Sequence, residues 1–109
     1  MGLPAPLRGE VWDVDFPDFG EHPAVVMSAN ALNARLGHVA VIPITGTPGP
    51  DETHIALDAD AGLTRYDESF ADITALQPVA RVNVLVHRGR LSLGELDRVD
   101  GHLRTYLGL

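Results

Sequence analysis

Short apolar and β-branched segments, separated by clusters of glycine, proline and aspartate, limit most strongly what this chain can fold into. Segments of this kind, bounded by turn residues, are typical of β-strands. The first alternates Val11, Val14 and Phe16 with acidic residues, as a half-buried strand does, and Trp12 breaks the alternation as a bulge would. The predicted strands lie at residues 9–16, 23–28, 38–45, 53–57, 70–76 and 79–91.

Two other segments are typical of helices. Residues 28–37 begin with a serine that can cap a helix and end with a glycine, which predicts a short helix. Later, Ser92 and Glu95 have the spacing of a capping box, and Gly108 suits the end of a helix. Between them, apolar residues recur every three or four positions and form one stripe: Leu93, Leu96, Val99, Leu103 and Leu107. The expected fold class is therefore mainly β (α+β): a small curled sheet or barrel of antiparallel strands, with a short helix and a packed C-terminal helix.

The length and composition indicate one globular domain over residues 1–109. A hydrophobic content of 45% with 21% charged residues favours a folded core over disorder. The chain has no cysteine, which excludes disulfides, thiol nucleophiles and thiolate zinc sites and is compatible with a cytoplasmic location. No apolar run approaches the ~20 residues of a membrane helix, and the first residues lack a signal-peptide pattern, so we expect no membrane association.

The charge of the chain limits its partners. The net charge is -7, and all basic residues are arginines. Proteins that bind nucleic-acid phosphates without sequence preference usually carry a basic surface. A nucleic-acid role would therefore need a local arginine patch, and the densest candidate is "VHRGR" at residues 86–90. The histidines show no paired spacing of the kind found in zinc sites, so no metal or other cofactor is predicted.

The chain contains, in this order, the blocks "RGEVWDVDF", "HPAVVMSANALN", "VAVIPIT" and "GRLSLGELDRVDGHLRTYLGL". In order and spacing they resemble the MazF/PemK-type toxins of toxin–antitoxin modules, from about Arg8 to the end of the chain. The resemblance implies an SH3-like (CcdB-like) barrel and a homodimer that cleaves single-stranded RNA, including mRNA, at short sequences without a metal ion. It also implies a cognate antitoxin, acidic and partly disordered, as protein partner.

The resemblance assigns site residues, with departures from the family pattern. Members usually carry a catalytic arginine before the proline that opens the second strand, and here the pair is His22 and Pro23, after a shorter loop. The family's threonine at the end of the next apolar strand is present as Thr45. Some members have an acid before a late glutamine, whereas here Leu76 precedes Gln77.

RNA cleavage without a metal needs one group to take the 2′-hydroxyl proton, one to protonate the leaving 5′-oxygen and one to steady the phosphate. His22 suits either proton transfer, because histidine titrates near neutral pH, but it is a weaker phosphate clamp than arginine. Thr45 can donate a hydrogen bond to a phosphate oxygen. The alternative for both is structural: a solvated loop histidine, and a strand-end threonine that hydrogen-bonds its own loop.

Other side chains are candidates for supporting roles. Asp18 or Glu21 could orient His22, and Phe19 could stack an unpaired base. Gln77 and Arg81 are candidates for RNA contact near the same mouth of the sheet, although a solvated surface charge is the alternative for Arg81.

Two functions from different classes follow. The first is the toxin of a toxin–antitoxin module, a metal-independent, sequence-specific endoribonuclease. The second is a catalytically degenerate member of the same fold that works as a regulatory module and binds an antitoxin-like peptide. The matching threonine and the histidine support the first, whereas the missing arginine and the negative net charge support the second.

Overall fold

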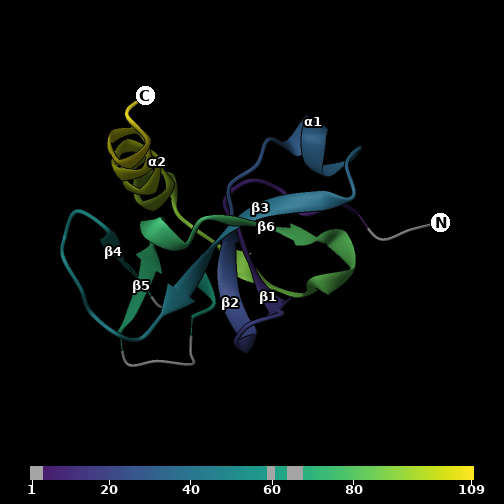
Figure 1. Cartoon of the computed structure of the whole chain (residues 1–109), viewed down its shortest axis with the longest axis horizontal. Coiled ribbons are helices and arrows are strands. Elements are labelled where there is room, and N and C mark those ends of the chain that lie inside the picture. Colours follow the sequence, from purple (N-terminus) through teal and green to yellow (C-terminus); the bar gives the residue numbers. More distant parts are fainter. Residues whose placement is uncertain (1–3, 59–60, 64–67) are drawn as a thin grey trace.

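A computed structural model describes residues 4–58, 61–63 and 68–109, which form a curled antiparallel sheet with one long helix (Figure 1). The mainly β fold predicted from the sequence is confirmed. The strands are β1 (Glu10–Phe16), β2 (Gly20–Val26), β3 (His38–Thr45), β4 (His54–Leu57), β5 (Ser69–Asp72), β6 (Gln77–Ala80) and β7 (Val84–Arg90). The helices are α1 (Asn30–Asn33) and α2 (Leu93–Leu107), and the 3₁₀ turns η2 (Ile73–Ala75) and η3 (Arg81–Asn83) precede β6 and β7.

The strands follow the order β4-β5-β3-β2-β1-β7, and β6 pairs with β3. One edge of β3 pairs with β2, and the other edge pairs with β6 at residues 38–41 and with β5 at residues 44–45. Strands β7, β1, β2, β3 and β6 therefore curl around a shared interior. Among the described residues no ladder joins β6 to β7, since η3 lies between them, so the predicted barrel is an open curled sheet.

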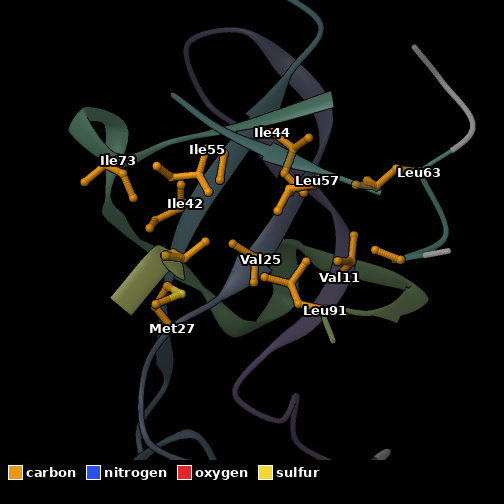
Figure 2. Packing of buried hydrophobic residues seen from close by; sticks show 13 residues of the cluster. Val11, Val25, Met27, Ile42, Ile44, Ile55, Leu57, Leu63, Ile73 and Leu91 are labelled. Carbon is orange, nitrogen blue, oxygen red and sulfur yellow. The ribbon is translucent and has the colours of Figure 1, made fainter. Parts of the chain in front are cut away.

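Two apolar clusters lie on opposite faces of the central strands. Because successive residues of a strand point to opposite faces, β3 supplies Ile42 and Ile44 to one cluster and Val39 and Val41 to the other. The helix-side cluster, which α2 covers, is drawn in Figure 2 and consists of Val11, Val25, Met27, Ile42, Ile44, Ile55, Leu57, Ala61, Leu63, Ala71, Ile73, Leu91 and Val99. The inner cluster, inside the curl, consists of Val14, Phe16, Ala24, Val26, Val39, Val41, Val79 and Val84.

Helix α2 begins and ends where the sequence predicts. The Ser92 hydroxyl accepts a hydrogen bond from the Glu95 N–H, and the Glu95 carboxylate accepts one from the Ser92 N–H, so the capping box is confirmed. Gly108 ends the helix in the left-handed conformation, with φ of 74°.

The apolar stripe of α2 is shorter than predicted. Val99 is buried, and Leu96 and Leu103 pack against the helix-side cluster, but Leu93 is 84% exposed and Leu107 is also exposed. The helix therefore docks through its middle turns, and its last turns extend away from the sheet (Figure 1). In the part of the chain that the structure describes, no helix is both long and apolar enough to span a bilayer.

Several predicted boundaries are wrong. The second strand begins at Gly20 rather than Pro23, because Gly20 adopts a φ of 79° and closes a tight turn of residues 17–19. The helix predicted at residues 28–37 is only the four-residue α1, since the Ser28 hydroxyl bonds the Asn33 side chain and the Ala40 N–H instead of capping. The 3₁₀ turns η2 and η3 interrupt the strands predicted at 70–76 and 79–91.

The irregularity predicted near Trp12 is confirmed in the pairing of β1 with β7. The register of that pairing shifts between Val11 and Trp12 and again between Asp13 and Val14. Strand β7 forms one end of the strand order, and its residues 85–88 are exposed.

Candidate functional site

His22 lies within strand β2, not in the loop where the sequence suggested it. Strands β1 and β2 pair in an unbroken antiparallel register, with His22 opposite Val14 and Gly20 opposite Phe16. This register places His22 on the face that carries the inner cluster, where the residue is half-buried. The histidine is therefore held by a strand ladder, which fixes its backbone more firmly than a solvated loop would.

A chain of ring contacts links the hairpin turn to His22. The ring of Phe16, which is 1% exposed, stacks on the ring of Phe19 with centroids 4.5 Å apart and an interplanar angle of 17°. Phe19 in turn meets the His22 ring at 5.2 Å and 63°, an edge-on arrangement. The tight turn thus folds Phe19 back onto the hairpin, so that a buried phenylalanine anchors the ring that packs on the histidine.

Thr45 ends β3 and faces the same side of the sheet as His22. Strands β2 and β3 pair from Val26–Val41 to Ala24–Pro43, and His22 and Thr45 each lie two residues beyond the last of these pairs, so alternation puts both on the face of Ala24 and Val41. The Thr45 hydroxyl oxygen accepts a hydrogen bond from the Thr47 N–H at 3.1 Å, which leaves its proton able to donate. The two principal residues predicted from the sequence thus lie on the same face of two paired strands.

Asp18 and Glu21 are placed differently from each other. Asp18 is exposed at the tip of the hairpin turn. Glu21 pairs with Asp15, and its position in the strand puts it on the opposite face from His22. The Glu21 charge acts on Arg88, where it adds to the larger effects of Asp13 in raising the pKa of the guanidinium.

The ion pair between Asp13 and Arg88 is a feature that sequence reasoning missed. Asp13 is 8% exposed, and its carboxylate accepts a hydrogen bond from Arg88 Nε at 2.6 Å and lies 2.5 Å from Nη2. The hydrogen bond and the charge of Asp13 together raise the pKa of Arg88. The signal that could have indicated its burial is the alternation of side chains along a strand. Asp13 lies two residues from Val11 and therefore shares the face of the helix-side cluster.

Gln77 lies on the face of Thr45, and Arg81 lies at the far end of β3. Gln77 pairs with Val41, and its side-chain amide donates to the Ala75 carbonyl at 3.1 Å. The Arg81 N–H donates to the Gly37 carbonyl just before β3 begins. At the usual rise of a strand, residues 37–45 span about 26 Å, so the Arg81 backbone lies at the far end of β3 from Thr45, while its guanidinium carbon lies 5.8 Å from the Trp12 ring.

The groups that come together on this face suit proton transfer and phosphate contact. An imidazole exchanges protons near neutral pH, and a hydroxyl donates a hydrogen bond to an anionic oxygen. Within residues 4–58, 61–63 and 68–109, no group of three or more histidine, aspartate or glutamate side chains is arranged to hold a metal ion.

Comparison with known proteins identifies the class to which this chain belongs. The sequence model of the family described as "PemK-like, MazF-like toxin of type II toxin-antitoxin system" matches residues 7–107, and the chain belongs to this family. Among curated relatives are Endoribonuclease MazF1 of Mycobacterium bovis and Endoribonuclease MazF4 of Mycobacterium tuberculosis. Each is 26% identical over 105 residues, which cover 96% of this chain and 95% of the relative.

Solved structures share the fold along nearly the whole chain. An endoribonuclease in complex with its cognate antitoxin, from a mycobacterial species, matches with a TM-score of 0.86 and 24% identity and covers 96% of this chain and 97% of its own. MazE-MazF (Form-II) from Deinococcus radiodurans matches with a TM-score of 0.81 and 21% identity over the same shares. The curled sheet with a C-terminal helix is therefore the fold of the family.

Proposed function

We propose that this member of the toxin family is a metal-independent endoribonuclease that cleaves single-stranded RNA, including mRNA, at short sequences. The observation that carries the proposal is the alternation of side chains along the paired strands β2 and β3, which puts His22 and Thr45 on one face, each two residues beyond the Ala24–Pro43 pair. A proton carrier and a hydrogen-bond donor are thereby brought to adjacent strand ends, as cleavage at a phosphate requires.

The reaction uses the 2′-hydroxyl of the RNA as nucleophile. The 2′-oxygen forms a bond to phosphorus as the bond from phosphorus to the 5′-oxygen breaks, and the products carry a 2′,3′-cyclic phosphate and a 5′-hydroxyl. One proton leaves the 2′-hydroxyl and one joins the 5′-oxygen; His22 exchanges one of them and water the other. Thr45 donates a hydrogen bond to a phosphate oxygen and steadies the charge that builds there.

The supporting residues predicted from the sequence divide according to their positions. Phe19 packs on His22, and Asp18 stands at the adjacent turn, where it can contact the RNA or orient the histidine. Glu21 acts through Arg88 on the opposite face. Gln77 shares the face of Thr45 and contacts RNA farther along β3. Arg81, at the opposite end of that strand, contacts RNA there.

The assembly we propose follows the family. The chain acts as a single domain, residues 1–109, that forms a homodimer in the cytoplasm, and a cognate antitoxin neutralises it. One of the structural relatives is an endoribonuclease in complex with its cognate antitoxin, which supports this partner.

A second function, a catalytically degenerate module that binds an antitoxin-like peptide, is favoured by two sequence facts. Histidine stands where the family usually has arginine, and the net charge is -7. Such a module would keep the fold and the peptide-binding surface but leave RNA intact.

The test is incubation of the pure protein with a long RNA in EDTA, followed by analysis of the product ends. His22→Ala is expected to lower the cleavage rate by about 100-fold or more, as for loss of a general acid or base. Thr45→Ala should lower it by about tenfold to 100-fold. The matched controls are His38→Ala and Thr105→Ala, since His38 is exposed at the opposite end of β3 and Thr105 is exposed on α2.

Two results would overturn the proposal. One is RNA that stays intact under all conditions while the protein still binds an antitoxin peptide, which establishes the binding module. The other is cleavage that His22→Ala and His38→Ala affect equally, which removes His22 from the chemistry.

A further inference from the structure

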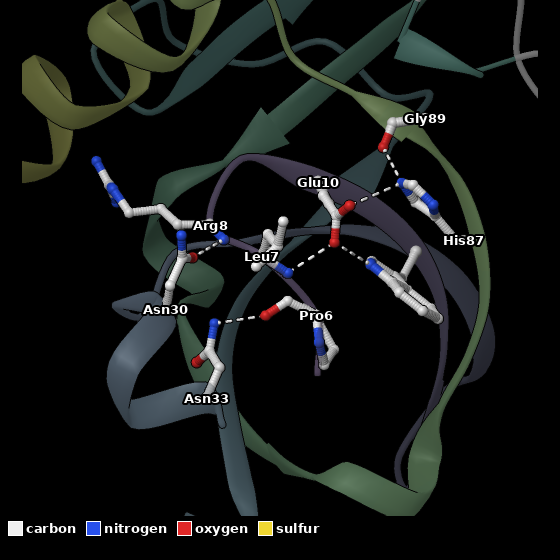
Figure 3. Close-up of polar contacts among 9 residues, drawn as sticks. Pro6, Leu7, Arg8, Glu10, Asn30, Asn33, His87 and Gly89 are labelled. Atoms are coloured by element: carbon white, nitrogen blue, oxygen red, sulfur yellow. Dashed lines mark hydrogen bonds and ion pairs between the residues drawn. The ribbon is translucent and has the colours of Figure 1, made fainter. Parts of the chain in front are cut away.

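A cavity of about 380 Å³ lies between the N-terminal segment and strands β1 and β7, away from the hairpin turn. It is lined by Pro4, Ala5, Leu7, Glu10, Trp12 and His87. Figure 3 shows Leu7 on one side, His87 on the other and the Glu10 carboxylate between them. Its size falls in the usual range for small-molecule sites, and most of its walls are apolar.

The Glu10 carboxylate is the polar centre of this cavity and keeps a spare acceptor. Its Oε1 atom accepts hydrogen bonds from the Leu7 N–H at 2.6 Å and from Trp12 Nε1 at 3.2 Å. Its Oε2 atom lies 3.2 Å from His87 Nε2, its one polar partner among the described residues (Figure 3). Since a carboxylate oxygen can accept two hydrogen bonds, Oε2 can take one more donor from a ligand.

Stacked side chains form the aromatic wall. The ring of His87 stacks on that of Trp12 at 5.0 Å and 23°, and the Arg81 guanidinium carbon lies 5.8 Å from the Trp12 ring. His87 Nε2 also lies 2.9 Å from the Gly89 carbonyl, so this nitrogen faces two acceptors and carries the ring proton. Arg81 donates to the Pro4 carbonyl at 3.1 Å and ties the N-terminal wall to the stack.

The cavity lies on the same face as His22. Trp12 is two residues from Val14, the strand partner of His22, and diagonal neighbours across an antiparallel pair are about 7–8 Å apart. Neighbouring nucleotides of one RNA strand can span this spacing, so the same strand can reach both His22 and the cavity. This link rests on the proposed function.

We propose that the cavity is a specificity subsite that takes one unpaired nucleobase bearing an exocyclic amino group: adenine, cytosine or guanine. Unpaired bases bind by stacking on aromatic side chains and by hydrogen bonds to their edges. Here the His87 ring, whose side chain is 46% exposed, offers the stacking surface, and Glu10 offers the hydrogen-bond acceptor. The spare acceptor on Glu10 accepts a hydrogen bond from the amino group, as acidic side chains do from cytosine. Uracil instead presents carbonyl oxygens on both sides of its N–H, and the carboxylate repels them.

The test uses Trp12, the single tryptophan of the chain, as a built-in probe. Titration of the whole protein with AMP, CMP, GMP and UMP should change its fluorescence, and UMP should bind about tenfold more weakly than the others. This measurement needs no cleavage, so its outcome is separate from that of the proposed function.

The variant Glu10→Gln sharpens the test. The glutamine side chain keeps one oxygen, which can still accept the hydrogen bonds from Leu7 and Trp12, but its amide nitrogen replaces the spare acceptor with a donor. The variant should therefore bind UMP more tightly than the other three mononucleotides. In digests of a long RNA, the same substitution should alter the base preferred at one position near the cut. Glu52→Gln, on the exposed β3–β4 loop, is the matched control and should leave both preferences unchanged.

Three results would overturn the proposal. The first is fluorescence that none of the four mononucleotides changes. The second is equal binding of all four by the wild type and by Glu10→Gln, with circular dichroism showing that the variant is folded. The third is a response to N-acetyl-leucinamide but not to mononucleotides, which assigns the cavity to a side chain of a protein partner.

Discussion

The two faces of the sheet are used differently. On the helix-side face, α2 covers the apolar cluster, and Ile73 and Val99 are both fully buried. One buried acid there, Glu95, accepts backbone hydrogen bonds from Asp58 and Ser92, both at 2.8 Å. At the ends of the inner face, polar and aromatic side chains gather instead: Phe19 and His22 by the hairpin turn, and Glu10, Trp12 and His87 farther along β1.

The difference separates what stabilises the molecule from what acts on a substrate. On the helix-side face, the apolar side chains of the cluster are buried and the Glu95 carboxylate is hydrogen-bonded, so few groups there are available to a ligand. Side chains at the ends of the inner cluster are half-buried or exposed, and they rest on rings or ladders that hold them in place. Changes on the helix-side face should therefore affect folding, and changes at the ends of the inner face should affect catalysis.

The largest expected effect on folding is that of Ile73→Ala. Removing this buried side chain should lower the free energy of unfolding by about 2–5 kcal/mol, because it leaves a cavity under α2. Urea denaturation measures the loss, with Val82→Ala as a control at a side chain that is 82% exposed. The distinction between the two faces would be contradicted if Ile73→Ala lowered the cleavage rate per folded molecule but left the free energy of unfolding unchanged.

Phe19→Ala should lower the cleavage rate by about tenfold to 100-fold, because the ring that positions His22 is lost. Steady-state kinetics distinguishes this role from the base stacking that the sequence suggested. A fall in kcat at constant KM indicates a positioning residue. A rise in KM at constant kcat would assign Phe19 to RNA binding instead and contradict the positioning role.

Ser92→Ala should cost about 1 kcal/mol of stability, since the hydroxyl accepts the Glu95 N–H at the start of α2. Ser92→Asp preserves an acceptor at the cap and should recover most of the loss. Chemical denaturation of the three proteins is the measurement. Equal stability of Ser92→Ala and the wild type would show that the cap is dispensable, and cleavage should be unchanged in all three.

The smallest effect concerns acid pH. Burial alone would raise the pKa of Glu95, but hydrogen bonds from the Asp58 and Ser92 backbone outweigh it, and the pKa is lowered. The stabilisation is therefore complete above the ordinary pKa of about 4.3 and is lost as the pH falls through the lower, folded-state value. The stability gap between the wild type and Glu95→Gln should narrow from pH 5 to pH 3. A gap that widens over that range contradicts the assignment.

The sequence predicts a structural feature correctly where residues close in sequence determine it. The capping box, the left-handed Gly108 and the irregularity at Trp12 all depend on residues close in sequence, and all three were predicted. The start of β2 was not, because the turn residues of "PDFGEH" do not reveal that Gly20 alone supplies the left-handed conformation that closes the hairpin. His22, which was predicted to lie in the loop, therefore lies in strand β2.

The site was predictable only in part, because it depends on register between strands that are distant in sequence. His22 and Thr45 were identified from the family pattern, but their common face follows from the ladder of β2 with β3. The ion pair of Asp13 with Arg88 and the contact of Glu10 with His87 join β1 to β7, more than 70 residues apart in sequence. No periodicity within either strand indicates such partners.

The most direct test of the central claim, that His22 carries the chemistry at the uncovered end of the inner face, is the pH–rate profile of RNA cleavage in EDTA. We expect the wild-type rate to change between pH 5 and pH 8, the range in which histidine titrates, and His22→Arg to lose that change. A flat wild-type profile, or the same profile in both proteins, would contradict the account.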